Sequence, residues 1–508
     1  MKMLLPTMLA LGCAVFSCGG GQVKAPVEQL DEEAAEVLIH RLPDTTFSSV
    51  SQIQFVIEQV DSSDGTLQYL DDPYLARSGD NLTFRGGQKR DYPFPGRLDS
   101  AAVRLEKVWA FDTYYDTTGS VLGTWGGGSG WTGQPLHVHW PDSAACKDEI
   151  IVGSLCSRVY FIDFNTGKAS RPWLDAKNVL KGTSSLDPSL NGNLYIGHGV
   201  RKGAADCGLA LADLNTHRIE KVFGHDKKAY RGWDGNDSSP VVAGGFLFRP
   251  SENGSIYKYI IGKGSLTLHS CLRYKYKSAG PGIESSMAVF RNYGYVGDNR
   301  GNIICLNLDN LTPVWVYQNH DDTDASIVVE EVDGVPWLYS GTEVDKQGSS
   351  GFSYLVKLNG LTGERVWEYK HPCSQLHLTT GKIMEGGMYT TPLLGRGDCD
   401  SLLFTCFETH RPALKGDFVA LNRHTGKVVY TIPLPRYAWS SPVPFYHGDK
   451  LYIVQPDCKG TIHLIDAREG KILDSLPVGN NFESSAVVSG DTFVIGSRGK
   501  TIYKVRVR

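Results

Sequence analysis

The feature that most constrains this chain is a short phrase that returns eight times: two small residues, often Ser-Ser, followed by Pro or an apolar residue. Each phrase opens a short apolar run, as in Ser238-Ser239-Pro240-Val241-Val242. A repeat of roughly 40 to 65 residues made of strands and turns indicates radial repetition, because one four-stranded unit cannot bury both of its faces alone. We therefore predict an all-β fold, an eight-bladed β-propeller. The third residues of the phrases are Pro135, Pro188, Pro240, Met287, Ile327, Pro392, Pro442 and Ala486.

A second repeated signal is the turn that precedes the fourth strand of a unit. It reads Asp or Asn, then three residues, then Gly, at 163–168, 359–364, 422–427 and 466–471. The Asp or Asn side chain closes its own turn, and Gly adopts the positive φ that reverses the chain. An aromatic residue follows at Trp315, Trp367 and Tyr430, where we expect it to pack between blades. These turns predict architecture and no chemistry.

The two ends of the repeat region predict how the ring closes. The last unit has three expected strands, at 486–488, 492–496 and 501–507, so an outer strand is missing. The segment Leu105 to Asp112 looks like a fourth strand with no unit before it. Pairing the two would remove the open edges of the sheet. We predict this closure, with the propeller spanning 101–508.

The N-terminus has the form of a signal peptide. Lys2 precedes a short apolar run that ends at Phe16, and Val15-Phe16-Ser17-Cys18 resembles a bacterial lipoprotein processing box. We predict a signal peptide over 1–18 with lipidation of Cys18; Cys13 as the lipidated residue and a plainly secreted protein are the alternatives. The protein is thus expected to be exported and anchored by lipid to the cell envelope, at the outer membrane. Residues 19–100 are expected to form a tether and a small, partly ordered segment, with a helix at Asp31–Leu42 and a strand at Gln52–Val60.

Charge and cysteine usage restrict the partners. The chain has 51 basic and 55 acidic residues and no basic run, which argues against nucleic acid as a partner. Nine of the eleven cysteines lie beyond Cys18, and an oxidising compartment would permit disulfides, with Cys146/Cys156 and Cys399/Cys406 the nearest pairs. No CxxC or CxxCH spacing occurs, so metal or haem ligation by these thiols has no support.

The residue before each repeated pair offers a candidate site. These residues begin the innermost strands, so their side chains should converge near the mouth of the channel. Three consecutive units supply carboxylates there, and converging acids repel one another unless a cation such as Ca²⁺ lies among them. The alternative is a structural brace in which each acid accepts hydrogen bonds from the neighbouring blade. The candidate residues are Asp237, Glu284, Asp324, Tyr389, Trp439 and Glu483.

Aromatic and histidine residues give weaker signals. Trp125, Trp131 and Trp233 lie in Gly-rich phrases that lead into inner strands, so they are expected on the same loop face. There they would bind sugar rings or a peptide, or else pack within the fold. His137 and His139 alternate on one strand, and without a carboxylate motif nearby we interpret them as surface or packing residues, with no metal site predicted.

The turn sequences resemble the β-propeller family named after pyrroloquinoline quinone (PQQ), whose repeat reads A-x-D-x-x-T-G-K-x-x-W. Residues 420–430 follow this pattern with Asn422 for Asp and Tyr430 for Trp, and residues 358–367 follow its second half. Phe84-Arg85-Gly86-Gly87 is similar to a phrase that commonly precedes the first blade in the family. The similarity covers about residues 82–508 and implies the same fold.

The functional implication of the resemblance divides into two branches. One comprises quinone-dependent dehydrogenases, which hold PQQ and Ca²⁺ on the axis and commonly carry an adjacent Cys pair that this chain lacks. The other comprises non-catalytic lipoproteins of the barrel-assembly type, which dock protein partners. We predict a membrane-anchored, non-catalytic scaffold with protein partners in a bacterial envelope complex and no cofactor. The alternatives are a PQQ- and Ca²⁺-dependent sugar or alcohol dehydrogenase, and a propeller that binds carbohydrate.

Overall fold

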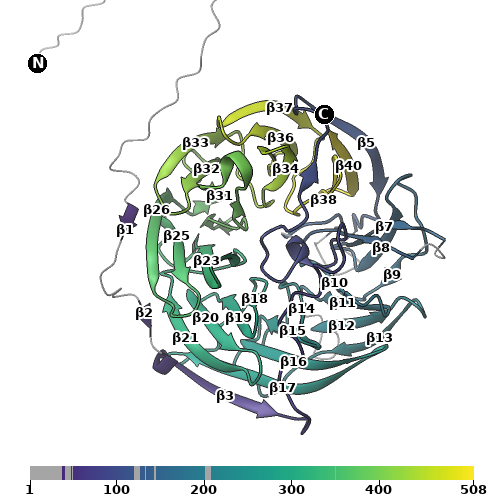
Figure 1. Cartoon of the computed structure of the whole chain (residues 1–508), viewed down its shortest axis with the longest axis vertical. Helices are drawn as coiled ribbons and strands as arrows, with labels where there is room; N and C mark the ends of the chain where they lie inside the picture. Colours follow the sequence, from purple (N-terminus) through teal and green to yellow (C-terminus); the bar gives the residue numbers. More distant parts are fainter. Residues whose placement is uncertain are drawn as a thin grey trace, which may run out of the picture.

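Eight β-sheets stand around a common axis, as predicted (Figure 1). The structure is a computed structural model that describes residues 37–39, 47–48, 50–118, 126–131, 133–141, 145–200, 207–348 and 350–508. The predicted signal peptide and Cys18 lie outside the described residues. Among the described residues, no helix combines the length and the apolar character needed to cross a bilayer.

Each blade is an antiparallel sheet that runs from an inner to an outer strand. Blade 1 contains β6 (Leu136–His139), β7 (Asp148–Gly153), β8 (Arg158–Asp163) and β9 (Leu174–Asp175). Blade 2 contains β10 (Ser185–Leu186), β11 (Asn193–Gly197), β12 (Leu209–Asp213) and β13 (Arg218–Phe223). Blade 3 contains β14 (Val241–Ala243), β15 (Phe246–Ser251), β16 (Ser255–Gly262) and β17 (Ser265–Tyr276). Blade 4 contains β18 (Ala288–Phe290), β19 (Tyr293–Gly297), β20 (Asn302–Asn307) and β21 (Thr312–Gln318).

The second half of the ring repeats this order. Blade 5 contains β22 (Val328–Val332), β23 (Val335–Gly341), β25 (Gly351–Asn359) and β26 (Arg365–Cys373). Blade 6 contains β30 (Leu393–Leu394), β31 (Leu402–Glu408), β32 (Gly416–Asn422) and β33 (Val428–Leu434), with β24 (Glu343–Val344) and β29 (Gly386–Gly387) joined to it. Blade 7 contains β34 (Val443–His447), β35 (Lys450–Pro456), β36 (Thr461–Asp466) and β37 (Lys471–Pro477).

Blade 8 closes the ring as predicted. Its inner three strands are β38 (Val487–Ser489), β39 (Thr492–Gly496) and β40 (Thr501–Val507), and its outer strand is β5 (Leu105–Asp112). β5 pairs antiparallel with β40, from Leu105 opposite Val507 to Asp112 opposite Thr501. The first and last strands of the propeller therefore lie side by side in one sheet (Figure 1).

The repeated small residues connect neighbouring blades. In four blades the first residue of the pair bonds within its own blade, as Ser238 Oγ does to the Pro250 carbonyl at 2.9 Å. In five blades the second residue accepts a bond from the preceding blade: Ser239 N donates to Ser286 Oγ at 2.9 Å. In blade 2 the equivalent acceptor is Thr183, whose Oγ1 accepts a hydrogen bond from Gln134 N of blade 1 at 2.8 Å. The phrase of blade 2 is therefore Gly182-Thr183, and the assignment of Pro188 was wrong because β10 ends before it.

The turns before the outer strands have the expected geometry. Asp163 Oδ1 accepts the amides of Asn165 and Thr166, and Gly167 has a φ of 70°. The aromatic residues after these turns join blades, as predicted. Trp367 Nε1 donates to the Arg423 carbonyl of the next blade at 3.0 Å, and Trp315 and Tyr430 bond in the same way to Gly360 and Ala467.

The N-terminal segment adds a fifth strand to three successive blades (Figure 1). β3 (Ile53–Gln59) pairs with β17 of blade 3, β2 (Phe47–Ser48) with β21 of blade 4, and β1 (Val37–Ile39) with β26 of blade 5. The strand predicted at 52–60 is confirmed. The helix predicted at Asp31–Leu42 is wrong for Val37–Ile39, because the edge of β26 gives these residues backbone partners in an extended conformation. The remainder of that predicted helix lies outside the described residues.

Residues 80–92 form a plug in the centre of the ring. Two buried arginines bond to backbone carbonyls: Arg85 Nη2 to Pro392 at 2.9 Å and Arg90 Nε to Met287 at 2.9 Å. The plug thus ties the inner strands of all eight blades together. One partner from each blade, in order, is His137, Leu186, Val242, Val289, Val329, Pro392, Pro442 and Ala486.

The nine cysteines from Cys146 to Cys458 are free thiols. Eight are buried and Cys146 is partly exposed. The pairs Cys146/Cys156 and Cys399/Cys406 are not bonded. Cys271 and Cys305 pack inside strands as small apolar residues.

Candidate functional site

The six candidate residues at the mouth of the channel, which we call the hub, occupy equivalent positions just before the inner strands. They are Asp237, Glu284, Asp324, Tyr389, Trp439 and Glu483. Asp237, Glu284, Asp324, Tyr389 and Trp439 line one small cavity. Trp131 lines it as well. In each blade the residue that bonds to the plug lies two to five positions after the hub residue in the sequence. The plug therefore closes the axis next to this cavity.

Lys181 is the hub residue that sequence reasoning missed. With the phrase of blade 2 assigned to Gly182-Thr183, Lys181 occupies the position that Asp237 occupies in blade 3. Its ammonium lies 2.9 Å from Asp237 Oδ2 and 4.5 Å from the centre of the Trp131 ring. Gly133 and Gly182 make equivalent close contacts with the next blade, and aligning these two glycines would have revealed the position.

Six carboxyl groups flank the cavity in two triads. Ligand oxygens of Asp237, Glu252 and Glu284 lie within 4.8 Å of one another. The same holds for Asp322, Asp324 and Glu343. Such convergence costs free energy unless protons or a cation neutralise the charges. The two triads concentrate acid groups on blades 3 to 6.

Burial and mutual repulsion shift the pKa values of these acids upward. Burial raises the pKa of Asp237 to about 7, against the opposing effect of Lys181. Burial raises the pKa of Asp322 to about 8, with Lys346 opposing. The pKa values of Asp324 and Glu343 lie well above their usual range, first through burial and then through neighbouring carboxylates. Protons therefore neutralise much of the hub near neutral pH.

Serine and threonine hydroxyls join adjacent blades beside the acids. Ser239, Ser286, Ser441 and their equivalents hold adjacent blades together. Some of the acids also contact a neighbouring blade: Asp237 pairs with Lys181 of blade 2 at 2.9 Å, and Glu483 accepts a hydrogen bond from the Trp131 backbone of blade 1. Asp324 shares a hydrogen bond with Glu343, and Glu483 also pairs with Arg498 at 3.1 Å.

Aromatic side chains fill the rest of the hub. The rings of Tyr389 and Trp439 stack at 5.0 Å, and Trp131 meets Trp439 edge-on at 5.4 Å. Trp439 Nε1 donates to Glu408 at 2.6 Å. Trp131 is therefore packed within the hub, while Trp233 is partly buried beside Glu252. Trp125 lies outside the described residues.

The hub does not fit a quinone cofactor. The cavity measures about 20 Å³, whereas sites for small organic ligands measure about 300–1,000 Å³. The stacked aromatic rings occupy the space that a planar cofactor would need. The oxygen donors suit a hard cation such as Ca²⁺ chemically, and the cavity is large enough for one ion or water.

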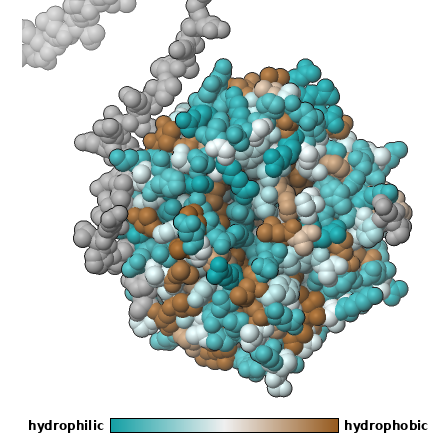
Figure 2. All heavy atoms as spheres, in the orientation of Figure 1, coloured by the Kyte–Doolittle hydropathy of each residue, from teal (hydrophilic) through white to brown (hydrophobic). Residues whose placement is uncertain are grey.

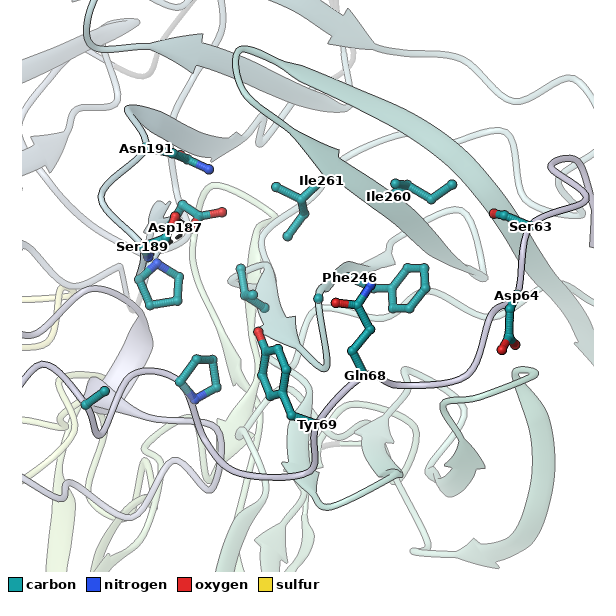
Figure 3. Close-up of a pocket in the computed structure, with 15 residues that line it drawn as sticks. Ser63, Asp64, Gln68, Tyr69, Asp187, Ser189, Asn191, Phe246, Ile260 and Ile261 are labelled. Carbon is teal, nitrogen blue, oxygen red and sulfur yellow. Dashed lines mark hydrogen bonds between the residues drawn. The ribbon is translucent and has the colours of Figure 1, made fainter.

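A larger groove lies at the edge of blades 2 and 3, under the segment that follows β3 (Figure 3). Its volume is about 690 Å³, and Tyr69, Phe246 and Ile261 contribute to its walls. Asp187 already accepts bonds from Ser189 and Tyr195, and Asp64 from Thr66. These carboxylates are therefore satisfied without a ligand. The face shown in Figure 2 is mostly polar, with smaller apolar patches between the polar residues.

Solved structures share this architecture at low sequence identity. No protein-family model and no curated protein matches the sequence. A quinohemoprotein alcohol dehydrogenase from Pseudomonas putida HK5 is 13% identical, with a TM-score of 0.59 over 84% of this chain and 80% of that chain. A europium-containing methanol dehydrogenase is 13% identical, with a TM-score of 0.59 over 88% of this chain and 100% of that chain.

BamB from Moraxella catarrhalis is 15% identical, covers 80% of this chain and 98% of its own, and has a TM-score of 0.49. At these identities the similarity establishes the fold alone. The chain is an eight-bladed β-propeller with the fold of the PQQ-like propellers.

Proposed function

We propose that this protein is a lipid-anchored scaffold of the bacterial cell envelope that docks extended segments of partner proteins on the outer edges of its blades. The observation that carries the proposal is the antiparallel addition of β1, β2 and β3 to blades 5, 4 and 3. The chain itself demonstrates that these edges accept extended segments. Backbone hydrogen bonds supply affinity in such strand addition, and side chains supply specificity.

The outer strand β33 of blade 6 is the edge that best fits a partner. It follows the three covered edges around the ring and, among the described residues, pairs only with β32. Val429 is 52% exposed on it. No residue of β33 is charged, whereas β13 carries Arg218 and Glu220 and β37 carries Lys471 and Asp474. Charges protect edges from pairing; β33 carries none, and Pro433 near its end is the one residue of the strand that lacks a backbone N–H donor.

The hub supports a scaffold over a dehydrogenase. Its cavity is too small for PQQ, and the plug fills the axis beside it. The carbohydrate alternative needs an open aromatic surface, but Trp131 packs edge-on against Trp439.

The anchor and the docking edge can be tested in the same cells. Labelled palmitate should be incorporated into the wild-type chain and not into Cys18→Ala, which should leave the membrane fraction. Partner proteins that co-purify with the wild type after cross-linking of membranes should no longer co-purify with Val429→Lys, because a charge on an edge strand opposes strand addition. Leu361→Lys, on an exposed turn, is the matched control and should retain them. Palmitate incorporation in Cys18→Ala would contradict lipidation at Cys18. Unchanged co-purification with Val429→Lys would contradict docking of partners on β33.

A further inference from the structure

A group of metal-binding side chains lies on blade 1, away from the hub. His137 and His139 occupy alternate positions of β6, so they share one face of the strand. Asp148 stands opposite His139 at the start of β7. A ring nitrogen of each histidine and a carboxylate oxygen of Asp148 all lie within 4.8 Å of one another. Two strands thus hold two imidazoles and a carboxylate together.

The imidazole ring of His137 has no hydrogen-bond partner among the described residues. Its side chain is almost completely buried, and neither ring nitrogen has a partner among the described residues. A buried polar group without a partner destabilises the folded state, so a native protein needs a reason to keep one. A neutral imidazole is the form of histidine that binds metal.

His139 is oriented as a ligand by a second carboxylate. Its Nδ1 lies 2.5 Å from Asp80 Oδ1, and its Nε2 lies 3.3 Å from Asp148 Oδ1. With bonds of about 2.0–2.2 Å, two ligands of a tetrahedral zinc ion stand about 3.3–3.5 Å apart. The spacing between Nε2 and Oδ1 matches that separation. Asp80 fixes the ring as outer carboxylates do in metal sites.

The other oxygen of Asp148 is also held in place. Asn165 Nδ2 donates to Asp148 Oδ2 at 3.2 Å, which leaves Oδ1 directed at His139. Two cations are close: Arg77 pairs with Asp80, and Lys504 donates to the Phe164 carbonyl at 3.0 Å. Asp80, Asp148 and Asp163 supply three carboxylates against these two cations, so the local charge favours a dication.

We propose that His137, His139 and Asp148 bind a divalent transition metal of the Zn²⁺ class, with Asp80 and Asn165 holding the ligands in place. Two nitrogens and one oxygen suit Zn²⁺ better than Ca²⁺ or Mg²⁺, which take oxygen ligands. Three protein ligands leave a fourth position for water. Because Asp80 belongs to the segment that enters the plug, bound metal would also connect blade 1 to that segment.

Cobalt(II) substitution tests this site directly. The full, untagged chain, stripped with a chelator, should bind one Co²⁺ with the visible absorption of a four-coordinate ion, and Zn²⁺ should displace it. His139→Gln should abolish that absorption and weaken Zn²⁺ binding at least about tenfold. His424→Gln, an exposed histidine on blade 6, is the matched control and should bind like the wild type.

Two results would overturn the site. One is an absorption spectrum of Co²⁺ with the full chain that equals that of the aqueous ion. The other is Zn²⁺ binding by His139→Gln that equals that of the wild type. His139 is 45% exposed, so the variant should fold; equal melting temperatures of the metal-free proteins check this. Asp148→Asn provides a second surface variant with the same expected loss.

Discussion

Lys181 Nζ lies 2.9 Å from Asp237 Oδ2 at the mouth of the propeller axis, and both side chains are buried. Burial alone would lower the pKa of Lys181, but the carboxylates of Asp237, Glu252 and Glu284 reverse this effect and raise it. The lysine therefore stays charged and partly offsets the repulsion within the first acidic triad. The pair connects blades 2 and 3 through equivalent positions of the repeat.

Replacement of this lysine should destabilise the protein strongly. Lys181→Met leaves Asp237 buried without its cation, and loss of one partner of a buried pair costs about 3–5 kcal/mol. Denaturant unfolding measures this loss. Lys177→Met removes an exposed ion pair with Asp175 and should change the free energy of unfolding by less than about 1 kcal/mol. Equal effects of the two substitutions would contradict a buried role for Lys181.

The hub should make stability depend on pH. The pKa of Asp237 is raised to about 7 and that of Asp322 to about 8, so the folded chain keeps protons that the unfolded chain releases near pH 4. The free energy of unfolding should therefore fall as the pH rises from about 5 to 8, by about 1.4 kcal/mol per pH unit for each retained proton. Asp322→Asn should flatten this slope, and the exposed Asp71→Asn should not. A stability that rises across this range would show that the hub acids are ionised.

The sequence predicted the ring closure to the residue and most of the hub. β5 and β40 were recognisable because each was an incomplete part of a repeated unit. Asp237, Glu284 and Asp324 were found because they hold the same position in successive units. Lys181 was missed because blade 2 has Gly182-Thr183 where four blades have Ser-Ser, and Pro188 was taken as the third residue of the phrase in place of Ser184.

The plug and the paired histidines could not be predicted in the same way. Residues 80–92 follow no period, and their bonds reach strands up to several hundred positions away, such as Ala486 from Tyr92. The sequence shows the buried Arg85 and Arg90 only as two charges in a loop. His137 and His139 were recognisable as a pair, but Asp80 and Asp148 come beside them only through tertiary contacts.

The plug should be part of the cooperative fold. Arg85 donates to carbonyls of Arg90, Thr391 and Pro392, and Arg85→Met would leave these oxygens buried without a donor. We expect a loss of about 3 kcal/mol or more in the free energy of unfolding. Arg97→Met, on the exposed part of the same segment, should be nearly neutral. A neutral Arg85→Met would mean that the plug is not needed for stability.

The size of the hub predicts that PQQ does not bind. Titration of the full chain with PQQ and Ca²⁺ together should give no quinone-dependent heat and no change in the quinone absorption. Titration with Ca²⁺ alone separates binding of an ion from binding of the cofactor. Stoichiometric quinone binding would require the Tyr389–Trp439 stack to open and would restore the dehydrogenase alternative.

The most direct test of the scaffold is photo-cross-linking from the edge of blade 6 in intact cells. A photoreactive residue at position 429 should form one reproducible adduct with an envelope protein, and the contact should map to an extended segment of that protein. The same residue at position 361 should form none. Adducts that are identical at both positions, or a cross-link from 429 only to the same chain, would contradict docking on β33.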